Sequence, residues 1–178
     1  VLSAAKRNGE ALAAADRALS KNSESAQAHD VRGLALLGLG QIEHAITSFR
    51  TALDYDLKYA PAFSNLGLAY RAQGEPRDAI SCFDEAIRLD ENNPGAYNNL
   101  GISLLDVNDL KQAETALRSA LSIEPDYAEA HYNLSRVLLM AEDFETGWKQ
   151  NEWRWLCSDF PSTWREFPQA MWQGEDLI

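Results

Sequence analysis

Three asparagines recur at a fixed interval in a pattern that could bind a polypeptide backbone. Asn65, Asn99 and Asn133 lie 34 residues apart, and each is followed by Leu and then by Gly or Ser. An asparagine amide offers both a donor and an acceptor, so it can pair with a peptide bond as another backbone would. An extended strand advances about 3.3 Å per residue. Three residues of such a strand would therefore match helices that stack about 8–10 Å apart.

The same period governs the small residues, which indicates the elements that must position these amides. The small residues fall in three registers: Gly33, Gly67, Gly101 and Ser135; Ala45, Ala79, Ala113 and Gly147; and Ala52, Ala86 and Ala120, with Arg154 as the exception. Small residues let two helix backbones approach closely. Gly40 and Gly74 are placed to end the first helices of their own repeats. Pro61, Pro94 and Pro125 stand where one pair gives way to the next.

A helix–turn–helix period of 34 residues resembles the tetratricopeptide repeat. The resemblance covers residues 6–156 and implies an all-α, right-handed superhelical solenoid of antiparallel helix pairs. Position 1 of the repeats is Ala26, Ala60, Pro94 and Ala128. The expected parts are an N-terminal half-repeat or capping helix at 1–25, repeats at 26–59, 60–93, 94–127 and 128–158, the last with a degenerate second helix, and a Trp-rich tail or the start of a further domain at 159–178.

In the resembling family, position 6 of the repeat lies on the first helix and faces a concave groove. Position 6 here holds the three asparagines and, in the first repeat, Val31. The O-linked N-acetylglucosamine transferases use an asparagine ladder at this position to hold substrate polypeptide, and Asn65, Asn99 and Asn133 match it whereas Val31 does not. The predicted peptide-binding residues are Asn65, Asn99, Asn133, Leu68, Arg71, Ile102, Leu105, Arg136 and Leu139.

Two other interpretations of this groove can be weighed from the sequence. Asparagine is common at position 6 across the family and is acceptable on a solvated helix face. In this interpretation, the three amides have only local partners and do not bind a ligand. Chaperone-binding repeats clamp a terminal carboxylate with Lys and Arg, but the predicted groove has only Arg71 and Arg136 and lacks the matching Lys/Asn set. Acidic tails are poor candidates for a chain of net charge −11.

All five tryptophans lie after residue 147, where the repeat pattern fails. They are Trp148, Trp153, Trp155, Trp164 and Trp172. The spacing places Trp148, Glu152 and Trp155 on one face of a helix. We favour the interpretation that Trp148 and Trp155 cap the open end of the repeats. The aromatic content of the tail exceeds what a cap needs, which favours an interface as well.

The same end of the chain resembles the junction at which certain bacterial proteins join such repeats to a heptosyltransferase-like glycosyltransferase domain. The matching residues are Gly147, Trp148, Glu152, Trp153, Arg154, Phe167, Pro168, Trp172, Gly174, Glu175 and Leu177. The resemblance implies that the chain is the recognition arm of an enzyme whose catalytic domain begins near Ile178.

No catalytic constellation is visible in the sequence. Walker, dinucleotide-binding, Gly-x-Ser-x-Gly and His-Glu-x-x-His motifs are missing. His29 and His131 occupy position 4, an aromatic packing position, and His44 has no second ligand at helical spacing. Cys82 is expected to be a packed residue. We therefore expect no enzyme activity, no cofactor and no metal in this chain.

Composition limits the partners. The chain has 178 residues, 46% of them apolar, and its acidic balance makes nucleic acid an unsuitable partner. We expect a protein or peptide ligand, no membrane insertion, and self-association through the C-terminal end as an open possibility. Two cysteines suit a reducing, cytoplasmic setting, although a chain that starts at Val1 leaves a removed signal peptide open. The alternative function is a free-standing scaffold that docks or self-associates through its Trp-rich end.

Overall fold

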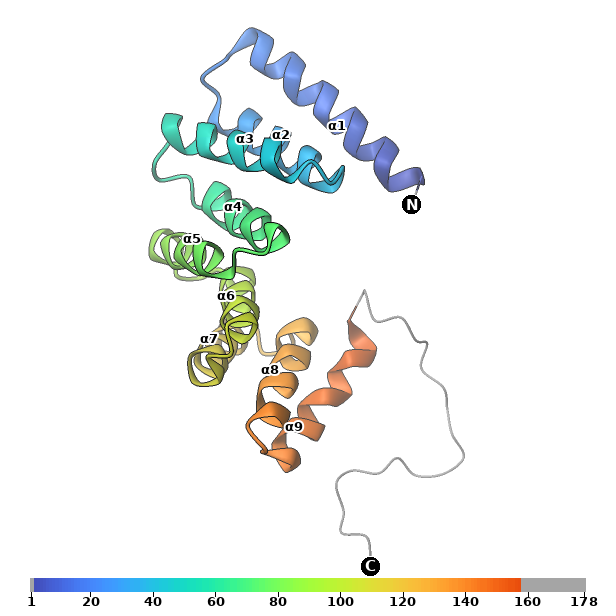
Figure 1. Ribbon diagram of the computed structural model, residues 1–178, viewed down its shortest axis with the longest axis vertical. Helices are drawn as coiled ribbons and strands as arrows, with labels where there is room; N and C mark the ends of the chain where they lie inside the picture. The colour runs from blue at the N-terminus through green and yellow to red at the C-terminus, as the bar shows by residue number, and fades with distance from the viewer. Residues whose placement is uncertain (1, 158–178) are drawn as a thin grey trace, which may run out of the picture. The chain divides into compact units, whose positions relative to one another are not determined.

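Helices account for nearly all of the chain that the structure describes. The computed structural model describes the backbone of residues 2–157 and the side chains from Ala4 onward (Figure 1). Its elements are α1 (Leu2–Lys21), α2 (Ala26–Gly38), α3 (Ile42–Tyr55), α4 (Ala60–Gln73), α5 (Pro76–Leu89), α6 (Pro94–Asp106), α7 (Leu110–Ile123), α8 (Ala128–Met140), α9 (Phe144–Asn151) and the 3-10 helix η1 (Glu152–Leu156). The all-α class predicted from the sequence is confirmed.

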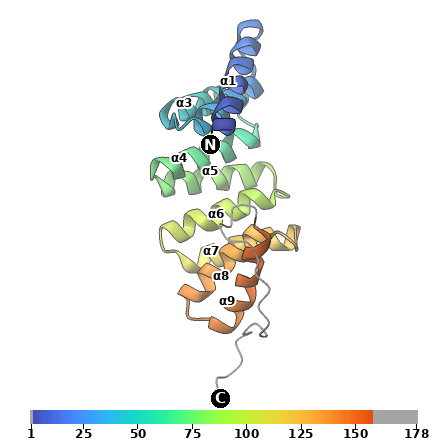
Figure 2. The same ribbon diagram turned by 90° about the vertical axis from the view of Figure 1, so that its right-hand side faces the viewer.

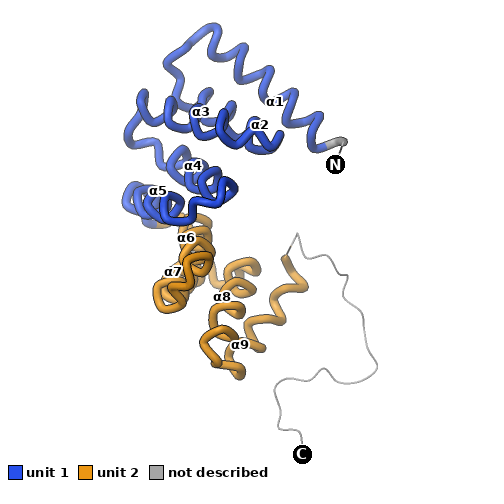
Figure 3. The backbone as a smooth tube through the Cα atoms, viewed as in Figure 1, with its two compact units in different colours: residues 1–91 blue, residues 92–178 orange. Residues whose placement is uncertain are grey.

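The chain divides into two compact units, residues 1–91 and residues 92–178 (Figure 3). In unit 1, α1 packs on α2, and the pairs α2–α3 and α4–α5 follow. In unit 2, the pairs are α6–α7 and α8–α9, and η1 packs on α8 (Figure 2). Each pair begins at the helix that the sequence predicts to carry position 6.

In every pair, a residue with left-handed backbone conformation lies in the turn between the two helices. Gly40 and Gly74 have φ of 75° and 89°, and Asn108 and Glu142 have φ of 61° and 64°. These four residues share one position of the 34-residue period. Glycine adopts this conformation freely and asparagine tolerates it, whereas a residue such as glutamate is strained there. The turn geometry is thus preserved in the fourth pair by a residue that does not favour it.

Glycine at position 8 lets the two helices of a pair approach closely. A Cβ built on any of three glycines would lie less than 3.0 Å from a large side chain of the paired helix: Gly33 against Phe49, Gly67 against Phe83, and Gly101 against Leu117. Phe49, Phe83 and Leu117 are fully buried. The small residue and the large one therefore form a matched contact in each complete pair.

The core of unit 1 is shared between consecutive pairs. Ile46, Phe49 and Leu53 of α3 form one buried cluster with Leu66 and Ala69 of α4. The second helix of a pair is thus buried on one side by the first helix of the same pair and on the other side by the first helix of the next pair. This is how a repeat buries an apolar face that it cannot bury alone.

Helix α1 takes the place of a preceding second helix. Arg32 of α2 donates from Nε to Asp16 Oδ1 of α1 at 2.9 Å and from Nη1 to Ser48 Oγ of α3 at 2.8 Å. The side chain of Asn8 lies against Gly38, where a Cβ would overlap it. These contacts attach the half-repeat to the first complete pair.

The second helix of the fourth pair is shorter than the second helices of the other three pairs. α3, α5 and α7 each contain 14 residues, but α9 has 8 and ends at Asn151. Residues 152–156 form η1, so the prediction of one α-helical face carrying Trp148, Glu152 and Trp155 is wrong. Asn151 replaces the large apolar residue at position 24, and the guanidinium of Arg154 donates to its carbonyl at 2.8 Å. Because no large apolar side chain is buried at position 24, the α-helix ends there and the chain continues as a 3-10 helix.

Candidate functional site

The first helices of neighbouring pairs lie against each other in each unit, α2 with α4 and α6 with α8. They carry the residues that the sequence predicts for peptide binding. We call residues Val31, Leu34, Asn65, Leu68 and Arg71 the unit 1 face, and residues Asn99, Ile102, Leu105, Asn133, Arg136 and Leu139 the unit 2 face.

On the unit 1 face, the amide of Asn65 ties α4 to α2. Its Nδ2 donates to Asp30 Oδ1 at 2.8 Å. Asp30 is only 4% exposed. Burial raises the pKa of the Asp30 carboxyl, and the hydrogen bond from Asn65 partly opposes that rise. Asn65 is half-buried, and its donor group is committed to the neighbouring helix.

On the unit 2 face, Asn133 makes the equivalent bond between α8 and α6. Its Nδ2 donates to Asn98 Oδ1 at 3.0 Å, and its own Oδ1 accepts from Arg136 Nη1 at 3.4 Å. Asn133 and Asn98 are 7% and 4% exposed. Both ends of the Asn133 amide are therefore occupied, and a bound peptide could reach it only by displacing these partners.

The two bonds assign the asparagine register a structural role. In both, the asparagine at position 6 donates to a polar side chain at position 5 of the preceding first helix, Asp30 or Asn98. Val31 occupies position 6 of the first pair, where α1 supplies no preceding first helix. Sequence reasoning missed the position 5 partners, although a polar residue 35 places before each of Asn65 and Asn133 was visible in the sequence.

Asn99 differs from the other two asparagines. It is half-buried on α6, and its side-chain amide makes no hydrogen bond to any residue between 2 and 157. Its backbone carbonyl accepts from Ser103 Oγ at 2.9 Å, inside the helix. Of the predicted ladder, Asn99 thus offers both its donor and its acceptor to a ligand.

The unit 1 face carries two exposed apolar side chains. Val31 and Leu34, one helical turn apart on α2, are 44% and 42% exposed. Leu68 of α4 is half-buried. Because they are neighbours on one helix face, these two side chains are candidates for a contact surface.

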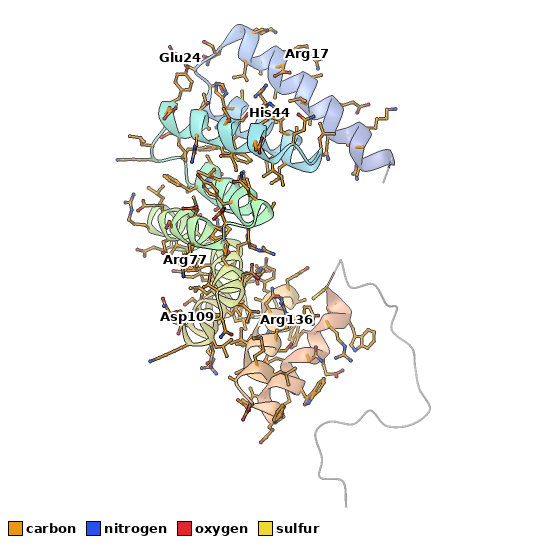
Figure 4. All side chains as sticks on the ribbon, in the orientation of Figure 1. Arg17, Glu24, His44, Arg77, Asp109 and Arg136 are labelled. Carbon is orange, nitrogen blue, oxygen red and sulfur yellow. The ribbon has the colours of Figure 1, made fainter. Side chains whose placement is uncertain are left out.

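The unit 2 face is better filled and more basic. Ile102 is half-buried, Leu105 is 7% exposed, and half-buried Leu139 packs where a Cβ on Gly147 of α9 would overlap it. Arg136 is exposed on α8 (Figure 4). Arg71, on the unit 1 face, is half-buried.

The tryptophans near the end of the described chain have different surroundings. Trp153 stacks on His131 with ring centroids 4.0 Å apart, and His131 Nε2 lies 2.7 Å from the carbonyl of Pro125. Trp155 is half-buried, with the Arg154 guanidinium 4.5 Å from its ring centroid. Trp148 is 41% exposed. Trp164 and Trp172 lie outside the described residues, as do residues 158–178 as a whole.

Of the two remaining histidines, His29 is packed against another ring and His44 is exposed. His29 stacks on Tyr55 with centroids 5.5 Å apart, and its Nε2 lies 2.9 Å from the carbonyl of Ser23. It therefore occupies position 4 as a packing residue, as His131 does. His44 is exposed on α3 (Figure 4).

The described residues include no grouped metal ligands, and the thiol of Cys82 is not activated. Within residues 2–157, no three His, Cys, Asp or Glu side chains are grouped to hold a metal ion. Burial raises the pKa of the Cys82 thiol to about 11, with a smaller contribution from Asp78. A thiol of that pKa stays protonated near neutral pH and is a poor nucleophile. In the same part of the chain, no helix combines the length and apolarity needed to cross a membrane.

Solved structures similar to this one are repeat proteins. MamA from Desulfovibrio magneticus RS-1 matches with a TM-score of 0.73 at 19% identity, over 80% of this chain and 81% of that one. YrrB, described as a TPR protein with an unusual peptide-binding site, matches at 0.68 and 24% identity, over 85% and 78%. The first TPR domain of Spaghetti (RPAP3), bound to the HSP90 peptide SRMEEVD, matches at 0.66 and 21%, over 68% and 96%. At these levels of sequence identity, the similarity supports a shared fold and says nothing about function.

Family models match the sequence in four overlapping stretches. Models described as tetratricopeptide repeat cover residues 60–93, 82–118 and 104–146, and one described as TPR repeat covers residues 33–74. No curated protein matches the chain. The matches run continuously over residues 33–146, with the period, the helix pairs and the solved structures all in agreement. The chain therefore belongs to the tetratricopeptide-repeat family.

Proposed function

We propose that this chain is a protein-interaction module that binds an extended peptide or a partner protein on the faces of its first helices. The observation that carries the proposal is the exposure of Val31 and Leu34 on α2, beside Leu68 of α4. Apolar side chains of a ligand would lower their exposure to water there. The peptide-binding descriptions of YrrB and of the RPAP3 domain support the same use of the fold.

Hydrogen bonding to a ligand backbone is assigned chiefly to Asn99. Its amide can donate and accept at once, whereas Asn65 and Asn133 already donate to Asp30 and Asn98. Asn65 retains its Oδ1 as an acceptor. We therefore propose fewer asparagine contacts with the ligand backbone than the three predicted from the sequence.

The experiment is a selection of phage-displayed random peptides on the full chain, followed by affinity measurement with the strongest synthetic peptide. Val31→Glu with Leu34→Glu places two charges where apolar contacts are proposed, and we expect at least about tenfold weaker binding. Leu57→Glu is the matched control, because Leu57 is 73% exposed in the connection between α3 and α4. It should leave affinity unchanged. Peptides that bind the double variant as tightly as the natural chain would contradict the proposal.

Asn99→Ala tests the backbone contact separately. One lost hydrogen bond should weaken a selected peptide that binds on the unit 2 face by roughly twofold to tenfold. The change spares the bonds from α4 to α2 and from α8 to α6, which alanine at Asn65 or Asn133 would remove. Unchanged affinity in Asn99→Ala, with circular dichroism also unchanged, would leave the asparagine register with its structural role alone.

We further propose that the module is the recognition arm of a larger bacterial glycosyltransferase-like protein. The support is the resemblance of the segment from Gly147 to Leu177 to a repeat–glycosyltransferase junction, and the part of it beyond Cys157 lies outside the described residues. The test is to read the gene beyond Ile178. A following domain of alternating strands and helices with Gly-rich loops is the expected result. An immediate stop codon would remove the proposal.

The alternative is a free-standing scaffold that docks a partner or a second copy through its Trp-rich end. The exposure of Trp148 on α9 favours it. Light scattering over a range of concentrations separates the cases, because a self-associating scaffold would gain mass with concentration. A monomer at every concentration would exclude the self-associating form.

A further inference from the structure

In the described part of the chain, a buried carboxylate adjoins the unit 1 face with one of its oxygens unbonded. Asp30 of α2 is only 4% exposed, and its Oδ1 accepts from Asn65 Nδ2 at 2.8 Å. Within residues 2–157, its Oδ2 accepts no hydrogen bond and pairs with no cation. Oδ2 is not among the fully buried side-chain atoms that lack a partner, so it still reaches solvent. A ligand could therefore contact this oxygen without displacing Asn65.

The residues that the structure describes supply no positive charge to Asp30. Burial raises the pKa of its carboxyl, and the influence that opposes this rise is the neutral amide of Asn65. Arg32, the nearest cation along the chain, donates instead to Asp16 and Ser48. An unpaired buried carboxylate is costly, and a cation that reached it would form a charge-assisted hydrogen bond. The site is therefore suited to a positively charged group.

The geometry favours lysine over arginine and over a chain terminus. Arginine binds a carboxylate best through two parallel hydrogen bonds, but Asn65 already occupies one oxygen of Asp30. A lysine ammonium is a compact charge that suits a single oxygen. Leu34, which is 42% exposed, lies one helical turn from Asp30, where the apolar stem of a lysine can cover it. A terminal amine has no such stem with which to reach a recessed oxygen.

We propose that the unit 1 face selects peptides that carry a lysine, whose ammonium pairs with Asp30 Oδ2 while its stem and neighbouring apolar residues cover Val31 and Leu34. This inference rests on the proposed function, because it names the ligand class of the same face. The net charge of −11 also favours the approach of a basic ligand. Asp30 then determines specificity, whereas the apolar pair contributes affinity for any apolar peptide.

The test uses short synthetic peptide pools, acetylated and amidated at their ends, with Lys, Arg, Met or acetyl-lysine fixed at the centre. Leu, Val, Ser and Gly are mixed at the other positions, and fluorescence anisotropy measures binding to the full chain. We expect the Lys pool to bind at least about tenfold more tightly than the Met and acetyl-lysine pools, because a hydrogen bond between charged groups is stronger than a neutral contact. The Arg pool should fall between them. Acetyl-lysine removes the charge from the ligand, so this comparison needs no variant protein.

Asp30→Asn should abolish the preference for lysine. The new amide keeps the shape of the side chain and can still accept from Asn65, so the bond between α4 and α2 is retained. Asp54→Asn is the matched control, because it removes the same charge from an exposed residue of α3. This control should bind the Lys pool as the natural chain does.

The outcomes separate this inference from the proposed function. Equal binding of the Lys and Met pools, with both weakened by Val31→Ser and Leu34→Ser, would overturn the role of Asp30 and leave the peptide site in place. The serine changes add no charge, so they neither attract nor repel lysine. A lysine preference that persists in Asp30→Asn would also overturn the inference, because another carboxylate would be responsible. Binding of none of the pools would overturn the inference and the proposed function together.

Discussion

The contact between Gly67 and Phe83 shows how much a single methyl group matters in these helix pairs. A Cβ on Gly67 would lie 2.8 Å from the ring of Phe83, which is fully buried. We expect Gly67→Ala to lower the free energy of unfolding by about 1–3 kcal/mol. Urea denaturation measures it. The matched control is Gly9→Ala on α1, where nothing lies within 4 Å and the better helix propensity should stabilise by up to about 1 kcal/mol. Equal effects of the two substitutions would contradict the packing argument.

Asp30 makes the stability of the chain depend on pH. Its pKa is raised in the folded state because the carboxyl is buried. The folded chain therefore holds this proton more tightly than the unfolded chain. The resulting contribution to stability is complete below the ordinary carboxyl pKa of about 4 and is lost as the pH rises through the raised value.

Asp30→Asn should remove that dependence, because asparagine still accepts from Asn65 without carrying a charge. The advantage of the variant over the natural chain in unfolding free energy should grow as the pH rises from about 4 towards neutrality. The natural counterpart is Asn98, which accepts from Asn133 in the same geometry. Asn98→Asp should produce the opposite trend. Parallel pH profiles for the natural chain and Asp30→Asn would exclude Asp30 as a source of the dependence.

At the scale of the element, the turn between α8 and α9 carries strain that the other turns avoid. Glu142 has a φ of 64°, at the position where Gly40 and Gly74 stand in unit 1. Left-handed backbone costs an ordinary L residue roughly 1–2 kcal/mol, part of which is offset by the lower entropy of its unfolded state relative to glycine. Glu142→Gly should therefore stabilise by about 0.5–1 kcal/mol.

Thermal unfolding followed by circular dichroism measures this gain. Gly74→Glu, the reverse change at the equivalent turn, should destabilise by about 0.5–1 kcal/mol. Asn108→Gly should have the smaller effect, because asparagine tolerates this conformation. A loss of stability in Glu142→Gly would mean that the glutamate side chain contributes more than its backbone costs.

At the scale of the whole molecule, the proposed peptide-binding residues belong to two compact units, residues 1–91 and residues 92–178. Val31→Glu with Leu34→Glu changes only side chains of α2 that are already exposed, so it should weaken the selected peptide without lowering the helical signal in circular dichroism. A lowered helical signal in this variant would mean that the lost affinity reflects unfolding rather than a lost contact.

The sequence by itself determined the all-α class and the helix–turn–helix repeat. A period of 34 residues, small residues at positions 8 and 20, and prolines at the junctions all depend on contacts within one pair, so they leave a local pattern. The failure of the fourth second helix was visible in the same way, at Asn151 and Arg154. Its end at Asn151 and the 3-10 turn after it were not, because they depend on which side chains find a buried site.

Only the tertiary structure decided what the asparagines do. Asn65 and Asn133 find their acceptors 35 residues away, on a neighbouring first helix, whereas the amide of Asn99 bonds to no described residue. It likewise separated Trp153, stacked on His131, from Trp148, which is 41% exposed. Identical residue types in one register differ in role because a hydrogen bond or a stacked ring needs a partner in space. The repeat pattern specifies where a side chain begins, but the packing of neighbouring pairs specifies what it meets.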